Sequence, residues 1–375
     1  MIHVLTVAHP RFDTRIWIKE IQSLVQAGYE VKYHVADGLG DRIKSNVEIK
    51  DYGIISAGTG FWSRLKKMYL VTKRAGFKKG DWIHFHDGIF LPFAILLGLR
   101  GCRIIYDVHE DYPRQVLNSR FPYPLKKLWG WTISLLEWSS RPIFTGYISA
   151  TPKIALRFPE DKTVTVQNFP LLSELVVAED KKLHGKENYC LYVGGISVVR
   201  GIYEILNATK ICESQNQDIK LALAGSYSPT EIREDLVKEH GWSTIEELGW
   251  LNREGVKHWM NKSRVGLVIL HPTKNYPDAY PVKMFEYMSA SLPVIASDFP
   301  LWREIVEDAN AGLVVDPLDP DAIAKAILWI FEHPEEADHM GKSGRAAIEN
   351  KFNWSIEKKK LLDFYQSRYV LGAGE

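Results

Sequence analysis

The sequence predicts an α/β protein with two doubly wound parallel-sheet domains that face an interdomain cleft. Three observations support this fold class. The chain has 375 residues, a length typical of about two domains. Short apolar runs alternate with amphipathic segments along nearly the whole chain, as buried parallel strands alternate with helices. A charged stretch within residues 169–188 separates two halves that each repeat this alternation.

The expected strands of the two halves are given by their residue ranges. In the first half they are residues 2–8, 30–36, 82–86, 103–109, 147–150 and 163–167. In the second half they are residues 189–193, 220–224, 265–270, 293–297 and 313–315. We expect a helix over 14–27, with Asp13 as its N-cap and Gly28 as its stop. The domains would be 1–170 and 171–353, and a C-terminal amphipathic helix over 354–370 could pack on either of them.

Composition excludes several classes of protein. The 47 basic and 46 acidic residues nearly cancel, and 46% hydrophobic with 25% charged residues is the average of globular proteins, not of disordered or coiled-coil chains. The pI of about 7.7 argues against a nucleic-acid partner, for which a domain pI above about 9 is typical. Three scattered cysteines indicate a reduced, cytoplasmic protein without disulfides or zinc. The longest apolar run, residues 89–99, is shorter than the ~20 residues that span a bilayer.

Residues 264–298 contain the first candidate site. A buried strand leads into a loop, and a short helix is expected to open at Pro281, a favoured first-turn residue. Lys283 stands at the helix start, where free N–H groups and a lysine together can bind an anion. Glu286, one turn further, is placed to accept hydrogen bonds from vicinal hydroxyls such as those of a ribose. The alternative is a solvated surface helix, which composition alone favours.

A second candidate site follows the strand at 189–193. Gly194 and Gly195 end that strand, and glycines let backbone amides approach a phosphate. Arg200 opens the next helix and can bind a phosphate through two hydrogen bonds. Ser226 and Gly249 follow two further strands of the same half, where a base and a diphosphate would lie.

These motifs resemble retaining GT-B glycosyltransferases of the family-4 type, also called glycosyl transferases group 1, over essentially the whole chain. The resemblance rests on Gly194…Arg200-Gly201, on residues 221–225, on Gly249, and on Asp278-x7-Glu286 ahead of residues 289–295. In the first half it rests on residues 9–24, 84–88, 106–113 and 165–170. It implies two Rossmann-like domains, with the acceptor bound by the first and a nucleotide-diphosphate sugar by the second. It also implies that the C-terminal helix 354–370, with Trp354 and Tyr365, packs back on the first domain. The acceptor would be a glycan or lipid-linked glycan, and no metal or other cofactor would be required.

The resemblance also implies roles for residues of the second half. Glu286 would hold the ribose, and Asp278 would face hydroxyls of the transferred sugar. Arg200 would bind the diphosphate. Three departures from the family pattern matter: Asp278 is one methylene shorter than the usual Glu, Gly195 stands where many relatives carry a phosphate-binding Arg, and Ser291 replaces the usual Gly. The last of these is tolerable. We expect Lys283 to supply the charge that is absent at Gly195.

In the first half, the resemblance places His109 beside the sugar, with Asp13 and Arg15 lining the acceptor side. Further acceptor-side candidates are His86, Asp87 and Glu110. His109 follows a buried strand, at the sheet edge where ligands bind in this architecture. Asp13 is equally well explained as a helix N-cap. Because His84 and His86 alternate on a strand, we expect one of them to point into the core.

Two segments suggest contact with a membrane. Residues 61–79 hold seven basic and no acidic residues among aromatic and aliphatic ones. Residues 124–142 form an amphipathic pattern with Trp129, Trp131 and Trp138. Basic residues beside aromatics suit a helix on anionic lipid at the inner face of the cell membrane. The alternative is that the aromatic residues pack on the sheet, and for the tryptophan helix alone that alternative is favoured.

Two other classes of function remain as rivals. A dinucleotide-dependent oxidoreductase needs G-x-G-x-x-G after its first strand, whereas residues 8–15 contain no glycine. A non-catalytic nucleotide-sugar-binding or scaffold protein of the same fold would keep the motifs without turnover. Nothing in the candidate segments resembles a DxD-type metal site, so cations and helix N-termini would carry the charge of the leaving group.

Overall fold

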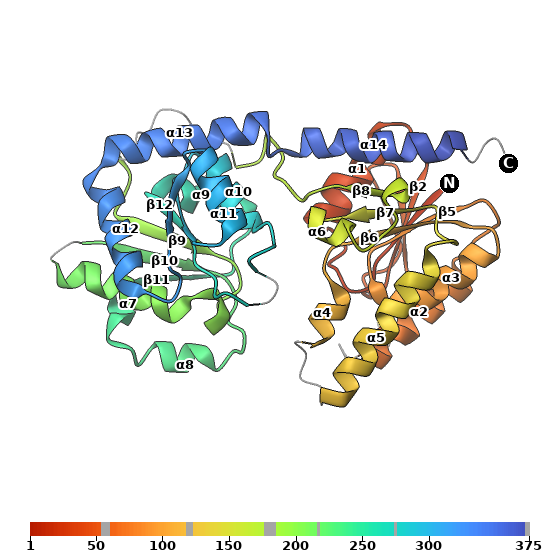
Figure 1. The fold of residues 1–375 in the computed structure, drawn as a ribbon, viewed down its shortest axis with the longest axis horizontal. Coiled ribbons are helices and arrows are strands. Elements are labelled where there is room, and N and C mark those ends of the chain that lie inside the picture. The colour runs from red at the N-terminus through yellow and green to blue at the C-terminus, as the bar shows by residue number, and fades with distance from the viewer. Residues whose placement is uncertain (54–60, 118–122, 176–184, 216–217, 274–275, 372–375) are drawn as a thin grey trace. The chain divides into compact units, whose positions relative to one another are not determined.

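The computed structural model describes the chain except for residues 54–60, 118–122, 176–184, 216–217, 274–275 and 372–375 (Figure 1). The chain divides into two compact units, Met1–Asn168 with Ile356–Glu375, and Phe169–Ser355. Each unit is an α/β domain built on a largely parallel sheet, which confirms the predicted fold class. The cleft expected between the domains stays a prediction.

The N-terminal unit contains a sheet with the strand order β3-β4-β2-β1-β5-β6-β7-β8. Its strands are β1 (Ile2–Leu5), β2 (Val31–Val35), β3 (Arg42–Lys44), β4 (Val47–Asp51), β5 (Trp82–Phe85), β6 (Arg103–Val108), β7 (Gly146–Ser149) and β8 (Thr163–Thr165). The pairs are parallel except β3–β4, a hairpin that the sequence analysis missed. Ser45 and Asn46 turn this hairpin at positive φ angles of 50° and 61°. Because β3 is short, charged and exposed, it has the features of an edge strand and lacks a buried run.

The helix predicted over 14–27 is present, with an unusual first part. A π-helix, η1 (Thr14–Ile21), leads into α1 (Gln22–Gln26). Asp13 caps it, because its Oδ1 accepts hydrogen bonds from the backbone N–H groups of Arg15 at 2.8 Å and Ile16 at 3.0 Å. Gly28 follows the helix at a φ of +88°, which only glycine adopts readily.

The other helices of the N-terminal unit lie on both faces of its sheet. One face is covered by α2 (Phe61–Arg74), α3 (Leu91–Leu99) and α5 (Tyr123–Ser140), and the other by α1 and α14 (Trp354–Leu371) (Figure 1). Tyr365 of α14 reaches the sheet, where its hydroxyl lies 2.9 Å from His84 Nδ1. The short elements are η2 (Gly88–Phe90), α4 (Tyr112–Leu117), α6 (Pro152–Ala155) and η3 (Glu160–Lys162).

The C-terminal unit contains a fully parallel sheet with the order β11-β10-β9-β12-β13-β14. Its strands are β9 (Tyr189–Val193), β10 (Lys220–Ala224), β11 (Ile245–Gly249), β12 (Val265–Val268), β13 (Val294–Ser297) and β14 (Gly312–Val315). Its helices are η5 (Val198–Arg200), α7 (Ile202–Ser214), α8 (Ile232–Leu236), η6 (His240–Thr244), α9 (Arg253–Lys262), α10 (Val282–Ser289), α11 (Pro300–Asp308), α12 (Pro320–Glu332) and α13 (Pro334–Asn350).

Two predictions for this unit were wrong. The edge strand β11 was left out of the expected strand ranges, although Gly249 was taken as a strand-end glycine, because exposed Glu246 and Glu247 interrupt its apolar pattern. The helix α10 begins at Val282, not at Pro281. Pro281 is its N-cap, because a ψ of 109° leaves this residue extended while the following residues are helical.

Candidate functional site

Three strand ends meet at glycines in the C-terminal unit. Gly194, just past β9, donates its N–H to Ala224 O at 2.9 Å, and Gly225, just past β10, donates to Gly249 O at 2.8 Å. Gly225 has a φ of +148°, and a Cβ there would lie 1.8 Å from Gly194 O. Side chains are therefore excluded where these strand ends approach, and backbone lies open at the carboxyl edge of the sheet. Ligands of such sheets bind at this edge.

Two cationic side chains converge on this glycine edge. Arg200, at the end of η5, directs its Nη1 toward Gly195 O at 3.4 Å. A Cβ built on Gly194 would lie 3.4 Å from Lys283 Nζ and 3.6 Å from Arg200 Nη1. The structure therefore brings together Gly194, Gly195, Arg200 and Lys283, as the sequence analysis expected.

Lys283 occupies an unusual environment for a lysine. Its Nζ is shielded from solvent and has no hydrogen-bond partner among the described residues. The Nζ lies 3.7 Å from the ring centroid of Tyr192, a cation–π distance. Burial, with a further contribution from Arg200, lowers the pKa of Lys283 to about 7, although Glu286 opposes this shift. The solvated-helix alternative is therefore wrong for this lysine.

Glu286 is held by an arginine that the sequence analysis missed. Its Oε1 accepts a hydrogen bond from Arg253 Nη1 at 2.6 Å, and Arg253 Nη2 also pairs with Glu174 Oε1 at 2.6 Å. Arg253 is the first residue of α9, after the N-cap Asn252. The capping residue Asn252 predicts that a helix starts here, but no pattern in the sequence predicts that Arg253 pairs with a glutamate on another helix. The Glu286 carboxylate is thus oriented, with its side chain 13% exposed.

Asp278 and Ser226 lie on loops of the same unit. Asp278 is partly exposed in a turn where Ala279 N–H donates to Tyr276 O at 3.0 Å. Trp302 Nε1 donates to Ala279 O at 2.7 Å, which fixes this turn against α11. Ser226 is exposed. Its carbonyl oxygen accepts a hydrogen bond from the backbone of the segment after β9, so the segments that follow β9 and β10 stay paired beyond the sheet.

A second polar cluster is buried in the N-terminal unit. Arg15 Nη2 lies 3.0 Å from Asp107 Oδ1, and Arg15 Nε lies 2.8 Å from Glu20 Oε1. Arg15 and Glu20 are five residues apart on η1, and the wider π-helical turn brings them to one side. The prediction that Arg15 lines an acceptor surface was wrong, because its side chain is buried between two carboxylates.

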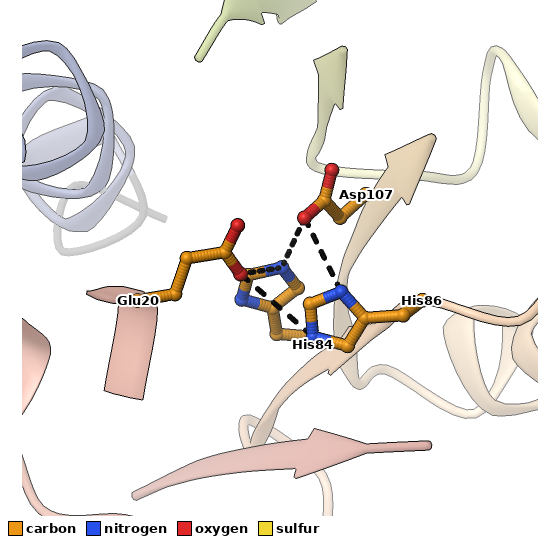
Figure 2. Close-up of side chains that lie close together, drawn as sticks. All are labelled: Glu20, His84, His86 and Asp107. Atoms are coloured by element: carbon orange, nitrogen blue, oxygen red, sulfur yellow. Dashed lines mark ion pairs between the residues drawn. The ribbon is translucent and has the colours of Figure 1, made fainter. Parts of the chain in front are cut away.

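His84 and His86 both belong to this cluster (Figure 2). The prediction that only one of them points into the core was wrong, because residues i and i+2 of a strand share a face. Both are fully buried, with ring centroids 4.6 Å apart, so His86 lines no exposed acceptor surface. Burial lowers the pKa of both imidazoles, that of His86 the more.

The two carboxylates of the cluster differ in their preference for a proton. Burial, and then the nearby Asp107 carboxylate, raise the pKa of Glu20 well above its usual value. Burial acts in the same direction on Asp107, but Arg15 and His109 outweigh it and hold the pKa of Asp107 well below its usual value. Asp107 is therefore the ionised partner of Arg15.

His109 is the part of this network nearest the surface. Its Nε2 lies 3.0 Å from Asp107 Oδ2 and 3.1 Å from His86 Nδ1, and its side chain is 15% exposed. Glu110, the next residue, is exposed. Both follow β6, at the carboxyl edge where the sequence analysis placed them.

Asp87 and Asp13 have structural partners instead of a free acceptor surface. Asp87 is buried, and its Oδ2 accepts hydrogen bonds from Val7 N–H at 2.6 Å and Thr6 Oγ1 at 3.1 Å. It therefore fixes the loop after β1, and the prediction of an acceptor-side Asp87 was wrong. For Asp13, the N-cap alternative is confirmed.

The face of the N-terminal unit formed by α2, α3 and α5 is partly apolar. Trp131 and Trp138 are each 64% exposed, so the prediction that the tryptophan helix packs into the core was wrong. Leu128 and Leu135 are also exposed, and these four residues recur every three or four positions along α5 as one outward stripe. On α2 the exposed basic residues are Arg64, Lys66, Lys73 and Arg74, whereas Lys67 Nζ donates to Ala36 O at 3.3 Å.

The side chains of Phe61 and Trp62, part of the same prediction, lie outside the described residues. Across the part of the chain that the structure describes, no helix combines the length and apolarity needed to cross a membrane.

Comparison with known proteins gives matches to both halves. Residues 177–347 match the family model described as glycosyl transferases group 1. The D-rhamnosyltransferase WbpZ of Pseudomonas aeruginosa is 23% identical over 277 residues. These are 72% of this chain and 66% of that protein, so the chain spans slightly less than two thirds of that relative's length. The O-antigen chain mannosyltransferase C of Escherichia coli is 22% identical over 299 residues, 77% of this chain and 75% of that protein.

Among solved structures, HepE of Anabaena in complex with UDP-glucose has a TM-score of 0.72 at 12% identity. The likeness covers 98% of this chain and 99% of that one. The structural likeness confirms the GT-B fold, and the family model matches the half of the chain whose motifs resemble glycosyl transferases group 1.

Proposed function

Because residues 177–347 belong to the glycosyl transferases group 1 family, we propose that this chain transfers a sugar from a nucleotide-diphosphate donor to a glycan. The observation that carries the proposal is the convergence of Arg200 and Lys283 on Gly194 and Gly195. Two cations that share a partly buried site repel each other and lose hydration. A bound dianion such as a diphosphate compensates both costs, which explains why the site keeps both side chains.

The same two cations address the main difficulty of the reaction. A departing diphosphate gains negative charge as the sugar develops oxocarbenium character, so a preorganised cation stabilises the transition state more than the ground state. We infer that Arg200 and Lys283 carry this charge, aided by the N-terminus of α10, and that the reaction requires no metal ion.

The remaining donor contacts follow from position. Glu286, oriented by Arg253, would accept hydrogen bonds from both ribose hydroxyls. Asp278 would face the hydroxyls of the transferred sugar from its loop. On the acceptor side, His109 would contact the sugar, because it is the partly exposed end of the buried histidine network. We propose retention of configuration, with a donor phosphate oxygen accepting the proton of the acceptor hydroxyl on the same face of the sugar.

The named relatives support the choice of substrates. The UDP-glucose bound by the Anabaena protein favours a nucleotide-sugar donor, and the O-antigen mannosyltransferase favours a polysaccharide or lipid-linked glycan as acceptor. Cleavage and transfer with a panel of UDP-, GDP- and ADP-sugars test the proposal, with the product anomer read by NMR.

We expect Lys283→Gln to lose turnover, and Lys342→Gln to keep it, because Lys342 is an exposed lysine that pairs with Asp338 on α13. Tight donor binding without any cleavage or transfer would instead favour a non-catalytic binding protein.

We further propose that the face formed by α2, α3 and α5 rests on an anionic membrane surface, at the cytoplasmic face of the cell membrane. The exposed stripe around Trp131 and Trp138 supports this, because exposed tryptophans beside basic side chains suit the lipid interface. Such contact would bring the N-terminal unit to lipid-linked acceptors.

A further inference from the structure

We propose that the buried cluster of Glu20, His84, His86 and Asp107 binds one divalent transition-metal ion, most suitably zinc, which holds η1 to the sheet. One ligand atom from each of the four side chains can be chosen so that all lie within 4.8 Å of one another, and all four side chains are fully buried. They come from η1, from β5 and the residue after it, and from β6 (Figure 2). The cluster belongs to the N-terminal unit and contains no residue of the donor site.

The hydrogen bonds around the two histidines leave the right atoms free for a metal. His84 Nδ1 lies 2.9 Å from Tyr365 Oη, and His86 Nδ1 lies 3.2 Å from Asp107 Oδ2 and 3.1 Å from His109 Nε2. If each Nδ1 carries the proton that it shares with these partners, each Nε2 keeps a lone pair. Metal-binding histidines have this arrangement, in which one ring nitrogen is oriented by a second group and the other binds the ion.

Those lone pairs meet a carboxylate oxygen and not a donor. His84 Nε2 and His86 Nε2 each lie 3.8 Å from Glu20 Oε2, beyond hydrogen-bond distance. All three atoms are buried without a hydrogen-bond partner among the described residues. Buried polar atoms are rarely left in this state. A single proton can join only two of these three atoms, whereas a metal ion satisfies all three at once.

The charges of the cluster also favour a cation. Glu20 and Asp107 are two buried carboxyl groups, and Arg15 is the buried cation between them. Two ionised carboxylates would leave one negative charge uncompensated, which is costly in a buried site. Arg15 contacts both carboxylates, and the partly exposed His109 contacts Asp107 as well, so Glu20 Oε2 is the carboxylate oxygen left with capacity for a metal.

The donor set and the distances suit zinc. Two imidazole nitrogens with carboxylate oxygens are common zinc ligands, and Zn–N distances of about 2.0–2.1 Å place tetrahedral ligands roughly 3.3–3.4 Å apart. The separations of 3.8 Å to Glu20 and 3.9 Å between His84 Nε2 and Asp107 Oδ2 are about half an ångström longer, and the widest pair, within 4.8 Å, closes further when the ion binds. Because the site is closed, the ion would enter as the chain folds and would be structural.

Metal analysis of the untagged full chain tests the proposal without any assay of activity. We expect about one equivalent of zinc by plasma mass spectrometry, retained through brief exposure to EDTA. After unfolding in guanidinium with a chelator, refolding with Zn²⁺ should give a higher Tm than refolding without it. Refolding with Co²⁺ should give visible d–d absorption of a four-coordinate site. A folded chain that binds less than about 0.1 equivalent of Zn²⁺, Co²⁺, Mn²⁺ or Fe²⁺ would overturn the proposal.

Substitutions place the ion. Glu20→Gln keeps the shape of the side chain, removes its charge, and should abolish stoichiometric metal. His34→Gln is the matched control, because His34 is a buried histidine of the same sheet that contacts His3 and Tyr52 outside the cluster. Metal retained in full by Glu20→Gln would refute the site. If Glu20→Gln does not fold, the Co²⁺ spectrum of the unaltered chain decides, since absence of d–d bands also refutes the site. These readouts do not depend on sugar transfer.

Discussion

Lys283 should take up a proton when the donor binds. In the ligand-free chain its pKa is about 7, against 10.5 for a free lysine. Each pKa unit corresponds to 1.36 kcal/mol, so burial and Arg200 together disfavour the ammonium by on the order of 5 kcal/mol. A diphosphate placed beside Nζ replaces the lost hydration and returns the pKa toward its ordinary value. The protonated chain therefore binds the donor more tightly, and binding adds a proton at pH values between the free and the bound pKa.

The expected magnitude follows from the pKa of about 7. If the bound pKa exceeds about 9, uptake should be roughly 0.1 proton at pH 6 and about 0.9 at pH 8, and Kd should rise by up to tenfold per unit above pH 7. Calorimetry with a nucleotide-diphosphate sugar in buffers of different ionisation enthalpy measures this uptake. The ligand-free fold should show the opposite trend and gain stability as pH rises from 7 to 10, because the unfolded lysine binds the proton more strongly there.

Two controls make this prediction specific to Lys283. Lys283→Arg keeps a cation that does not titrate in this range, so binding should persist without proton uptake. His271 is the other group whose proton uptake must be excluded. Its backbone N–H donates to Val199 O, and its ring Nε2 lies 3.0 Å from Glu204 Oε2. Uptake that persists in Lys283→Arg would point to such a histidine. Normal binding with uptake below about 0.2 proton at pH 8 would refute the reasoning for Lys283.

Three further predictions concern the donor site, the glycine edge and the membrane face. Glu286→Ala should weaken donor binding by about 1.5–3 kcal/mol, the range of charged hydrogen bonds, and unchanged affinity in calorimetry with an intact fold would remove the ribose assignment. Gly225→Ala should lower the free energy of unfolding in a urea titration by about 1–3 kcal/mol or more, because its Cβ would lie 1.8 Å from Gly194 O at a φ of +148°, and an unchanged midpoint would show that the strand ends can separate. Replacing both Trp131 and Trp138 with Ser should reduce co-sedimentation with anionic vesicles without lowering Tm, and binding that ignores the substitution, lipid charge and salt would exclude this face.

The strands that could be predicted are those buried on both faces. Residues 189–193 and 220–224 form β9 and β10 as expected. Their continuous apolar runs are typical of buried strands and do not show the spacing of apolar residues that marks a helix. The edge strands β3 and β11, and β4 beside β3, were not among the expected strands, because their polar residues resemble a loop in sequence. The π-helical turn of η1 was also not predictable, since its hydrophobic spacing is that of an ordinary helix.

The candidate site was predictable where chemistry follows a strand end. Gly194, Arg200 and Lys283 come together because parallel strands deliver their loops to one sheet edge. The pairing of Arg253 with Glu286 depends on how two helices pack, which no local pattern encodes. The burial of Arg15 was not predictable, because the spacing of residues in the sequence does not show whether a charged side chain near the sheet edge points to solvent or into the protein.

Steady-state kinetics of sugar transfer tests the central claim most directly. The measurement compares the unaltered chain, Arg200→Ala, Lys283→Ala and the double variant, each with and without brief EDTA treatment. Removing a preorganised group of this kind typically costs on the order of 10²–10³ in kcat, so each single variant should lose at least roughly tenfold. The double variant should lose less than the product of the two, because both cations act on one diphosphate, and EDTA should change nothing. Full activity in Lys283→Ala, or a strict requirement for Mg²⁺ or Mn²⁺, would contradict the account.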